Sequence, residues 1–293
     1  MAEGEQRPEV KAAPAKRTER TASAAVPTPP PWWRTLRADP PAAIRIAIGL
    51  GFIALVLLVW WFVTRGGPTE AIISPSKLPS PGAVLRKAPA LTEYLFDGII
   101  ASLQRVLLGV VLAAIVGVTL GVLAGANRAV SSALAPLVIF LRSIPMGALL
   151  PLMIMAFGTE DNEKTMFIFF AIVPFVFSDS VKAISIVPER YVETAQTLGA
   201  SRRQIIQKVL VPLALPDIVT SLRFQFGLAL GYVMLAEELN AKNGLGNMLN
   251  IYQHRGEIEQ IYALLFVIAL LAFVIDFLIR FFQRGVFQWR RDL

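Results

Sequence analysis

The sequence predicts an all-α membrane protein with six transmembrane helices. Hydrophobic residues make up 55% of the 293-residue chain, charged residues only 17%, and the mean hydropathy is +0.59. A soluble domain usually carries about 25% charged residues, so a water-soluble core could not bury this much apolar surface. Six segments approach the ~20 apolar residues that cross a bilayer: residues 46–63, 106–126, 133–157, 165–187, 218–236 and 261–279.

The first 43 residues differ from the rest, being rich in Ala, Pro, Thr and charge. We expect residues 1–43 to form a disordered cytoplasmic tail, because they cannot bury enough apolar surface to offset the entropy lost on ordering. A regulatory arm, or a contact with anionic lipid, is the alternative. The tail is too long for the n-region of a secretory signal. Residues 44–293 are predicted to form one transmembrane domain.

The first predicted span is uncharged and ends in Trp60 and Trp61, as is typical of a membrane interface. The second span is also uncharged and has a small residue at every fourth position. This spacing places a flat stripe on one helix face, where another helix can approach closely. We interpret the stripe as packing within the subunit, with a subunit interface or pore face as the alternative. Its members are Gly109, Ala113, Gly117, Gly121 and Gly125.

The other spans contain prolines or charges. A helix break is expected in the third span, where Arg142 and Pro145 lie among apolar residues. Two pairs have the spacing of neighbours on one helix face and are predicted to be local ion pairs. They are Asp179 with Lys182, and Asp276 with Arg280.

The basic residues predict the orientation, because cytoplasmic loops carry an excess of Lys and Arg. With the N-terminus in the cytoplasm, the cytoplasmic segments hold 18 of these residues and the opposite side holds seven, Lys164 included. Three arginines at or near bilayer depth are left out of this count: Arg105, Arg142 and Arg223. The acidic residues of 160–163 fall on the side of the membrane opposite the cytoplasm. Both termini are therefore predicted to be cytoplasmic, and the net charge of +7 reflects orientation rather than a nucleic-acid partner.

Several chemistries are excluded by composition. The chain has no cysteine, which rules out disulfides and thiolate metal sites. His254 is its single histidine, so a histidine metal centre or a Ser-His-Asp triad is not expected. We expect His254 to be a polar residue of an extramembrane loop.

A long polar segment, residues 188–216, separates the fourth and fifth spans. Its pattern predicts two short helices that project as a compact elbow on the cytoplasmic side. Gly199 is placed to end the first helix in a left-handed turn, and Ser201 to cap the second. The second helix is expected to end at Pro212. Ile205, Val209 and Pro212 are predicted to share one side, leaving Arg202, Arg203 and Lys208 available to water or a partner.

The elbow resembles the EAA loop of binding-protein-dependent ABC importer permeases. The match consists of Glu193 and Ala195, then Gly199, and the closing residues Val209 and Pro212. The chain departs from the usual pattern at Thr194, where Ala is common, and at Val211, where Leu is common. In that family the loop is a coupling helix that docks on the ATPase. The resemblance therefore implies ATPase-coupling roles for Glu193, Thr194, Ala195, Gly199, Arg202, Arg203, Val209 and Pro212.

Shorter motifs extend the resemblance to the nitrate, sulfonate and taurine subfamily over about residues 44–290. They are LPSPG at 78–82, LRSIP at 141–145, TLGASR at 197–202, AEE at 236–238 and GLG at 244–246. The fold implied is the type I ABC importer permease fold with cytoplasmic coupling helices. The solute implied is a small anion such as nitrate, bicarbonate, taurine or another sulfonate.

The resemblance also implies partners. The chain has no Gly-x-x-x-x-Gly-Lys-[Ser/Thr] motif, so a cytoplasmic ABC ATPase dimer is expected to bind ATP and Mg²⁺, and this chain is expected to be no enzyme and to bind no cofactor. A periplasmic or lipid-anchored solute-binding protein would deliver the solute. A second permease copy is expected, as a homodimer, with a heterodimer left open. The location implied is the bacterial inner membrane.

Charges at bilayer depth are the candidate pathway residues. Arg105 is expected to snorkel to the outer interface. Arg142 has two readings: a pore residue, or a contact with lipid phosphates or the ATPase. Glu237 and Glu238 precede a Gly- and Asn-rich segment, residues 240–250, that is expected to reach the outer leaflet. They are either structural or part of a gate, and with an anionic solute we expect them to brace a basic residue.

Two other functional classes were weighed. A membrane-embedded enzyme would need clustered His, Cys or carboxylates, which the sequence does not show. A passive channel or secondary transporter would have no use for a coupling elbow, and many secondary carriers contain inverted repeats. ATPase activity that appears only with a nucleotide-binding partner would separate these classes.

Overall fold

The computed structural model describes residues 35–37, 39–66 and 72–290. Most of the predicted disordered tail, residues 1–34 and 38, lies outside this described part. The chain divides into two compact units, residues 1–56 and 57–293. The helix α1 (Ala42–Thr64) is continuous across this division, and its apolar side chains are largely exposed, as expected of a helix that faces lipid.

The second unit is helical throughout its described residues. Its elements are α2 (Pro81–Lys87), η2 (Ala88–Leu91), α3 (Thr92–Ala126), α4 (Arg128–Ser143), α5 (Met146–Phe157), α6 (Asp161–Ile186), α7 (Glu189–Thr197), α8 (Arg202–Ile205), η3 (Ile206–Leu210), α9 (Val211–Asn240), α10 (Leu245–Arg255) and α11 (Ile258–Val286). Among the described residues, five helices are long and apolar enough to cross a membrane. Counting α4 and α5 as one broken span gives the six that the sequence predicts.

The third span is broken as expected. Helices α4 and α5 meet at an angle of 99°, where Ile144 and Pro145 adopt extended backbone conformations. A residue before proline is disfavoured in the helical conformation, which explains the position of the break.

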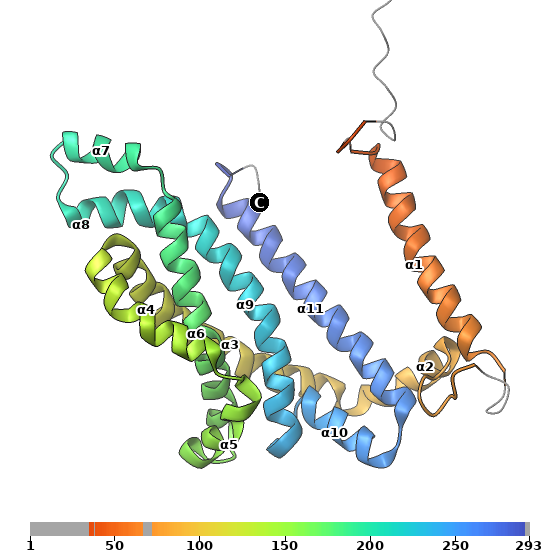
Figure 1. The fold of residues 1–293 in the computed structure, drawn as a ribbon. Coiled ribbons are helices and arrows are strands. Elements are labelled where there is room, and N and C mark those ends of the chain that lie inside the picture. Colours follow the sequence, from red (N-terminus) through yellow and green to blue (C-terminus); the bar gives the residue numbers. More distant parts are fainter. Residues whose placement is uncertain (1–34, 38, 67–71, 291–293) are drawn as a thin grey trace, which may run out of the picture. The chain divides into compact units, whose positions relative to one another are not determined.

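Helices α3, α6 and α9 form the centre of the bundle. Their shared core includes Val106 on α3, Ile168 and Ile172 on α6, and Val233 on α9, each fully buried. A second core joins α2, α10 and the first turns of α11. In Figure 1 the elbow elements α7 and α8 lie at the same end of this unit as the C-terminal end of α11, and α10 lies at the other end.

The stripe of small residues lies against α6. A Cβ at Gly117 would lie 2.9 Å from Val176 Cγ1, and one at Gly121 only 2.5 Å from Ser180 Cβ. Both distances are shorter than real side chains allow, so the two backbones touch along this face. Packing within the subunit, the first of the two interpretations, is confirmed.

The element boundaries differ from the predictions mainly at polar ends. Helix α3 starts 14 residues before the predicted span at 106, and α6 starts at Asp161 rather than 165. These turns carry charged residues, which a hydropathy criterion rejects but which a helix longer than the hydrocarbon tolerates.

The predicted end of the second elbow helix at Pro212 is wrong. One helix continues from Arg202 through Pro212 to Leu239. Proline lacks an N–H, and its ring clashes with the carbonyl four residues earlier. Here the turn before it, residues 206–210, widens to a π-helix, in which the Val211 N–H bonds to the carbonyl of Ile206. A π-turn of this kind accommodates a proline without ending the helix.

Candidate functional site

The turn of the elbow is held by two consecutive caps. At the end of α7 the Gly199 N–H bonds to the Gln196 carbonyl, and the Ala200 N–H bonds to the Ala195 carbonyl, both at 2.9 Å. This is the Schellman arrangement. It requires φ of +76° at Gly199, a value that glycine adopts without strain. The predicted left-handed stop at Gly199 is confirmed.

The second cap starts α8. The Ser201 Oγ accepts from the Gln204 N–H at 3.4 Å, and Gln204 Oε1 accepts from the Ser201 N–H at 2.8 Å. These reciprocal bonds form a capping box. Only Leu198, Gly199, Ala200 and Ser201 separate α7 from α8, so the angle between the two helices is fixed locally and does not depend on distant contacts.

Helix α7 is largely exposed to solvent within this chain. No residue of α7, all of which the structure describes, is buried, and Leu198 just after it is 82% exposed. Most of the residues assigned to coupling share this exposure: Glu193, Thr194, Gly199, Arg202, Arg203 and Pro212 are exposed, while Ala195 and Val209 are half-buried. Ile205, Val209 and Pro212 were predicted to share one apolar side of the second elbow helix. Ile205 is buried and Val209 half-buried, as that predicts, but Pro212 is exposed. Exposed apolar and charged groups on a rigid turn form a surface suited to a protein partner.

At the other end of the bundle, Arg105 is the centre of a buried polar cluster. Its guanidinium donates to Glu237 Oε1 at 2.6 Å, to Asp161 Oδ1 at 2.6 and 3.0 Å, and to the backbone and side-chain oxygens of Asn243 at 2.9 Å. All three of its nitrogens are therefore engaged. The expected snorkelling of Arg105 is wrong: the residue is 3% exposed and joins α3, α6 and α9. Buried ion pairs satisfied in this way are favoured over an unpaired buried charge.

Glu237 fastens the segment between α9 and α10. Besides Arg105, its carboxylate accepts from Ser102 Oγ at 2.8 Å and from the Gly246 N–H at 2.9 Å. Ser102 Oγ in turn accepts from the Leu245 N–H at 2.9 Å. The expectation that Glu237 braces a basic residue agrees with this geometry, in which the carboxylate is fully buried.

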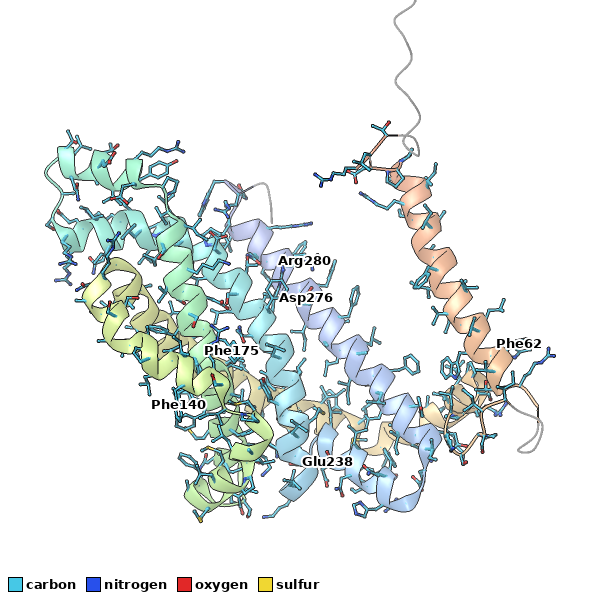
Figure 2. The ribbon with its side chains drawn as sticks, viewed as in Figure 1. Phe62, Phe140, Phe175, Glu238, Asp276 and Arg280 are labelled. Atoms are coloured by element: carbon cyan, nitrogen blue, oxygen red, sulfur yellow. The ribbon has the colours of Figure 1, made fainter. Side chains whose placement is uncertain are left out.

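Glu238 takes a different position from its neighbour. Its side chain is exposed at the α10 end of α9 (Figure 2), and its backbone carbonyl accepts from the Asn250 side chain at 2.9 Å. Residues 240–250 form the end of α9, a short link and part of α10, and their predicted approach to the outer leaflet stays a prediction. His254 lies on the last turn of α10 rather than in a loop, and it is exposed. Among the described residues, no group of His, Asp and Glu could hold a metal ion.

Arg142 lies just before the break between α4 and α5. It is exposed, and its guanidinium stacks 4.7 Å from the ring centroid of Phe175 on α6, the residue labelled in Figure 2. A cation over an aromatic face is stabilised in this geometry. The structure therefore separates Arg142 from Glu237 and Glu238, and the three residues assigned to the pathway do not form one site.

The acidic run at 160–163, predicted to lie on the side of the membrane opposite the cytoplasm, is partly buried. Glu163 and Lys164 are each 1% exposed and pair at 3.3 Å. Lys164 also donates to the Thr159 carbonyl at 2.9 Å. Residues 160–163 form the N-cap and first turn of α6, and the predicted side of the membrane stays a prediction.

Of the two predicted local ion pairs, one forms. Asp276 and Arg280 bond at 2.9 Å, as expected. In the described part of the chain Asp179 does not pair with Lys182. It accepts hydrogen bonds from Ser221 and Gln225 on α9 instead. Sequence spacing does not reveal these partners, because they lie 42 and 46 positions from Asp179.

A groove of about 860 Å³ lies between the first turns of α3 and α10. Its lining carries the carboxylates Glu93, Asp97 and Glu257. Burial raises the pKa of the Tyr252 hydroxyl in this groove above its ordinary value, and the charge of Glu257 raises it further. The sequence offered no signal for this groove.

Residues 117–291 match the family model described as binding-protein-dependent transport system inner membrane component. The chain belongs to this family. The permease is 32% identical to the taurine transport system permease protein TauC of Escherichia coli (strain K12) over 270 residues, which cover 89% of the permease and 96% of TauC. Family membership makes it a multi-pass, non-catalytic permease component of an ABC importer, which works with an ATPase and a solute-binding protein.

Other relatives show the same extent of similarity. The nitrate import permease protein NrtB of Synechocystis sp. (strain PCC 6803) is 32% identical over 255 residues, 83% of the permease and 89% of NrtB. The putative aliphatic sulfonates transport permease protein SsuC of Bacillus subtilis (strain 168) is 28% identical over 246 residues, 83% of the permease and 88% of SsuC. The fold is that of a chain in the inward-facing MetNI methionine ABC transporter, with a TM-score of 0.62 and 23% identity over 67% of the permease and 98% of that chain.

Proposed function

We propose that the permease forms the translocation path for a small anion and that its elbow couples this path to ATP hydrolysis by a partner. The observation that carries the coupling role is that helix α7 has no buried residue, while the turn after it is held by a Schellman motif and a capping box. A helix with no fully buried residue gains little packing stability within its own chain, so its exposure favours docking into another protein.

The expected partner at the elbow is a cytoplasmic ABC ATPase dimer, which would bind ATP and Mg²⁺. Glu193, Thr194 and Ala195 on α7 would contact it, together with Gly199 of the turn. Arg202 and Arg203 would add charge to this contact. Val209 and Pro212 would support it from the base of the second helix.

The proposed orientation places the elbow and both termini in the cytoplasm of a bacterial inner membrane. The excess of Lys and Arg supports it. In Figure 1 the C-terminal end of α11 lies at the same end as α7, as this topology requires. The groove between α3 and α10 would then face the solute-binding protein, whether periplasmic or lipid-anchored.

The names of the relatives support the proposed solute class. Proteins named for taurine, aliphatic sulfonates and nitrate share 28–32% identity with the permease, and these solutes carry an anionic oxygen group. We propose a solute of this class, with bicarbonate as a further member. A second copy of the permease would complete the path, because one bundle provides only one wall.

The experiment for coupling uses the natural absence of cysteine. Single cysteines at Arg202 or Gln204, both exposed, are crosslinked in membranes that contain the ATPase, with a cysteine at Gly51 as control. Crosslinks from the elbow positions only are expected. Binding-protein-stimulated ATPase activity should fall in proportion to crosslinking. An elbow that captures no ATPase, or that reacts with an impermeant thiol reagent from outside the cell, contradicts the proposal.

A further inference from the structure

Arg223 differs from Arg105 in that its guanidinium N–H donors have no hydrogen-bond partner among the described residues. Its side chain, on α9, is 10% exposed, and its Nε lies 3.1 Å from Asp276 Oδ1 on α11. This contact lacks hydrogen-bond geometry, and Nε is a buried donor without a partner. Across the described chain the Arg223 guanidinium donates no hydrogen bond, whereas Arg105 uses all three of its nitrogens. A buried guanidinium with free donors requires an acceptor from elsewhere.

The charges around Arg223 do not balance. Asp276 is shared with Arg280, whose Nη2 lies 2.9 Å from Asp276 Oδ2. Both residues come from the same stretch of α11 (Figure 2). Two guanidinium groups and one carboxylate leave a net charge of +1 at this face, with Asp276 and Arg280 toward the C-terminal end of α11. Arg223 itself lies within the predicted fifth span, 218–236. At such depth a net charge is costly unless water or a counter-ion neutralises it.

The structure leaves space beside this charge. A cavity of about 100 Å³ lies between α9 and α11, and its lining includes Arg223, Gly227 and Asp276. A water molecule takes roughly 30 Å³, so the cavity has room for a small oxyanion. Gly227 is open, because a Cβ there would meet nothing within 4 Å. The side chain next to Arg223, Phe224, is 62% exposed, so this face of α9 lacks a cover within the described chain.

We propose that Arg223, assisted by Arg280, binds the oxyanion group of the transported solute. The inference rests on the proposed function and adds the residues that would hold the anion. A guanidinium presents parallel N–H groups that match the oxygens of a nitrate or sulfonate. Asp276 is the resident counter-ion: it holds Arg223 in place when the site is empty and competes with the solute. This competition keeps binding weak enough for release.

The first test does not depend on which solute is carried. The cysteine of a Gly227→Cys variant would be the only one in the chain. In the assembled transporter, its rate of reaction is measured with an anionic, sulfonate-bearing methanethiosulfonate and with a cationic, quaternary-ammonium one. We expect the anionic reagent to react faster. Adding Arg223→Gln should lower the anionic-to-cationic rate ratio about tenfold, because one nearby unit charge is lost in a poorly screened site.

A matched control uses Arg86→Gln, which removes an exposed arginine on α2 and should leave the ratio unchanged. Arg280→Gln should lower the ratio less than Arg223→Gln does. An unchanged ratio in Arg223→Gln overturns the proposal. So does a cysteine that reacts with neither reagent, because water then does not reach the site.

The second test separates this inference from the proposed function. Proteoliposomes with the cognate binding protein and ATPase are assayed for uptake of radiolabelled taurine and of nitrate. Arg223→Gln should reduce uptake at least tenfold with the complex still assembled, and Arg223→Lys should retain part of it. Wild-type uptake together with full uptake by Arg223→Gln overturns the inference alone. If the wild type stimulates ATPase but carries neither anion, the proposed solute class fails and the inference fails with it.

Discussion

Arg105 Nη1 and Glu237 Oε1 lie 2.6 Å apart although the two residues are 132 positions apart in the sequence. Their side chains are 4% and 0% exposed. The pair fastens the end of α9 to α3 and, through Asn243, holds the link to α10. The Arg105 guanidinium is therefore the charged group in the set of contacts that close this end of the bundle, beside the hydrogen bonds of Ser102 and Gly246 to Glu237.

Arg105→Gln should destabilise the permease strongly. Removing one partner leaves the Glu237 carboxylate buried and unpaired, which typically costs about 3–5 kcal/mol. Thermal unfolding in detergent, followed by circular dichroism, checks this. The matched control is Lys242→Gln, which breaks the exposed Lys242–Glu160 pair and should cost no more than about 1 kcal/mol. Equal losses for the two variants would contradict the assignment.

Gly121→Ala should weaken the packing of α3 on α6. The new Cβ would lie 2.5 Å from Ser180 Cβ and 2.8 Å from the Phe177 carbonyl oxygen, and overpacking of this kind costs about 1–3 kcal/mol. Gly51→Ala on α1 meets nothing within 4 Å and should be neutral or slightly stabilising. The measurement is the midpoint of thermal unfolding, and a Gly121→Ala variant as stable as Gly51→Ala would contradict the close contact.

Gly199→Ala should loosen the elbow without affecting the bundle. A non-glycine residue at this left-handed φ costs about 1–2 kcal/mol, and the Schellman bonds of Gly199 and Ala200 should open more often. Hydrogen exchange at residues 196–204 should accelerate several-fold, while exchange in α3 stays unchanged. Gln196→Ala, at an exposed helical position, is the control. Under the proposed function, stimulated ATPase activity should fall in Gly199→Ala only.

Gly244→Ala and Gly256→Ala form a matched pair. Both glycines have positive φ, +126° and +68°, so both variants carry backbone strain. Only at Gly244 would the Cβ also meet the Glu237 carboxylate, at 2.5 Å. Gly244→Ala should therefore lower stability by at least about 1 kcal/mol more than Gly256→Ala. The two unfolding midpoints give this difference directly. A difference near zero would contradict the close packing of the Glu237 carboxylate against Gly244.

The features that the sequence could predict are those set by residues close together in the chain. The apolar segments, the break at Pro145, the left-handed stop at Gly199 and the cap at Ser201 all depend on a few consecutive residues, and all are confirmed. The stripe at Gly117 and Gly121 was also readable, because small residues at this spacing have a physical meaning of their own.

What the sequence could not predict depends on distant partners or on local compensation. Arg105 was expected at the interface because it opens the predicted second span, and Glu237 reaches it only through the fold. Asp179 had Lys182 one turn away yet pairs with α9. Pro212 was expected to end a helix, and the π-turn that accommodates it has no signature that the residue types reveal.

The continuous helix from Arg202 to Leu239, which includes the π-turn at 206–210, links the two ends of the permease. At 1.5 Å per residue these 38 residues extend about 57 Å. A tilt of about 5° at the Ser201 pivot would carry the far tip sideways by about 5 Å. That displacement exceeds the reach of a hydrogen bond, so a tilt of this size with α3 held fixed would separate Glu237 from Arg105.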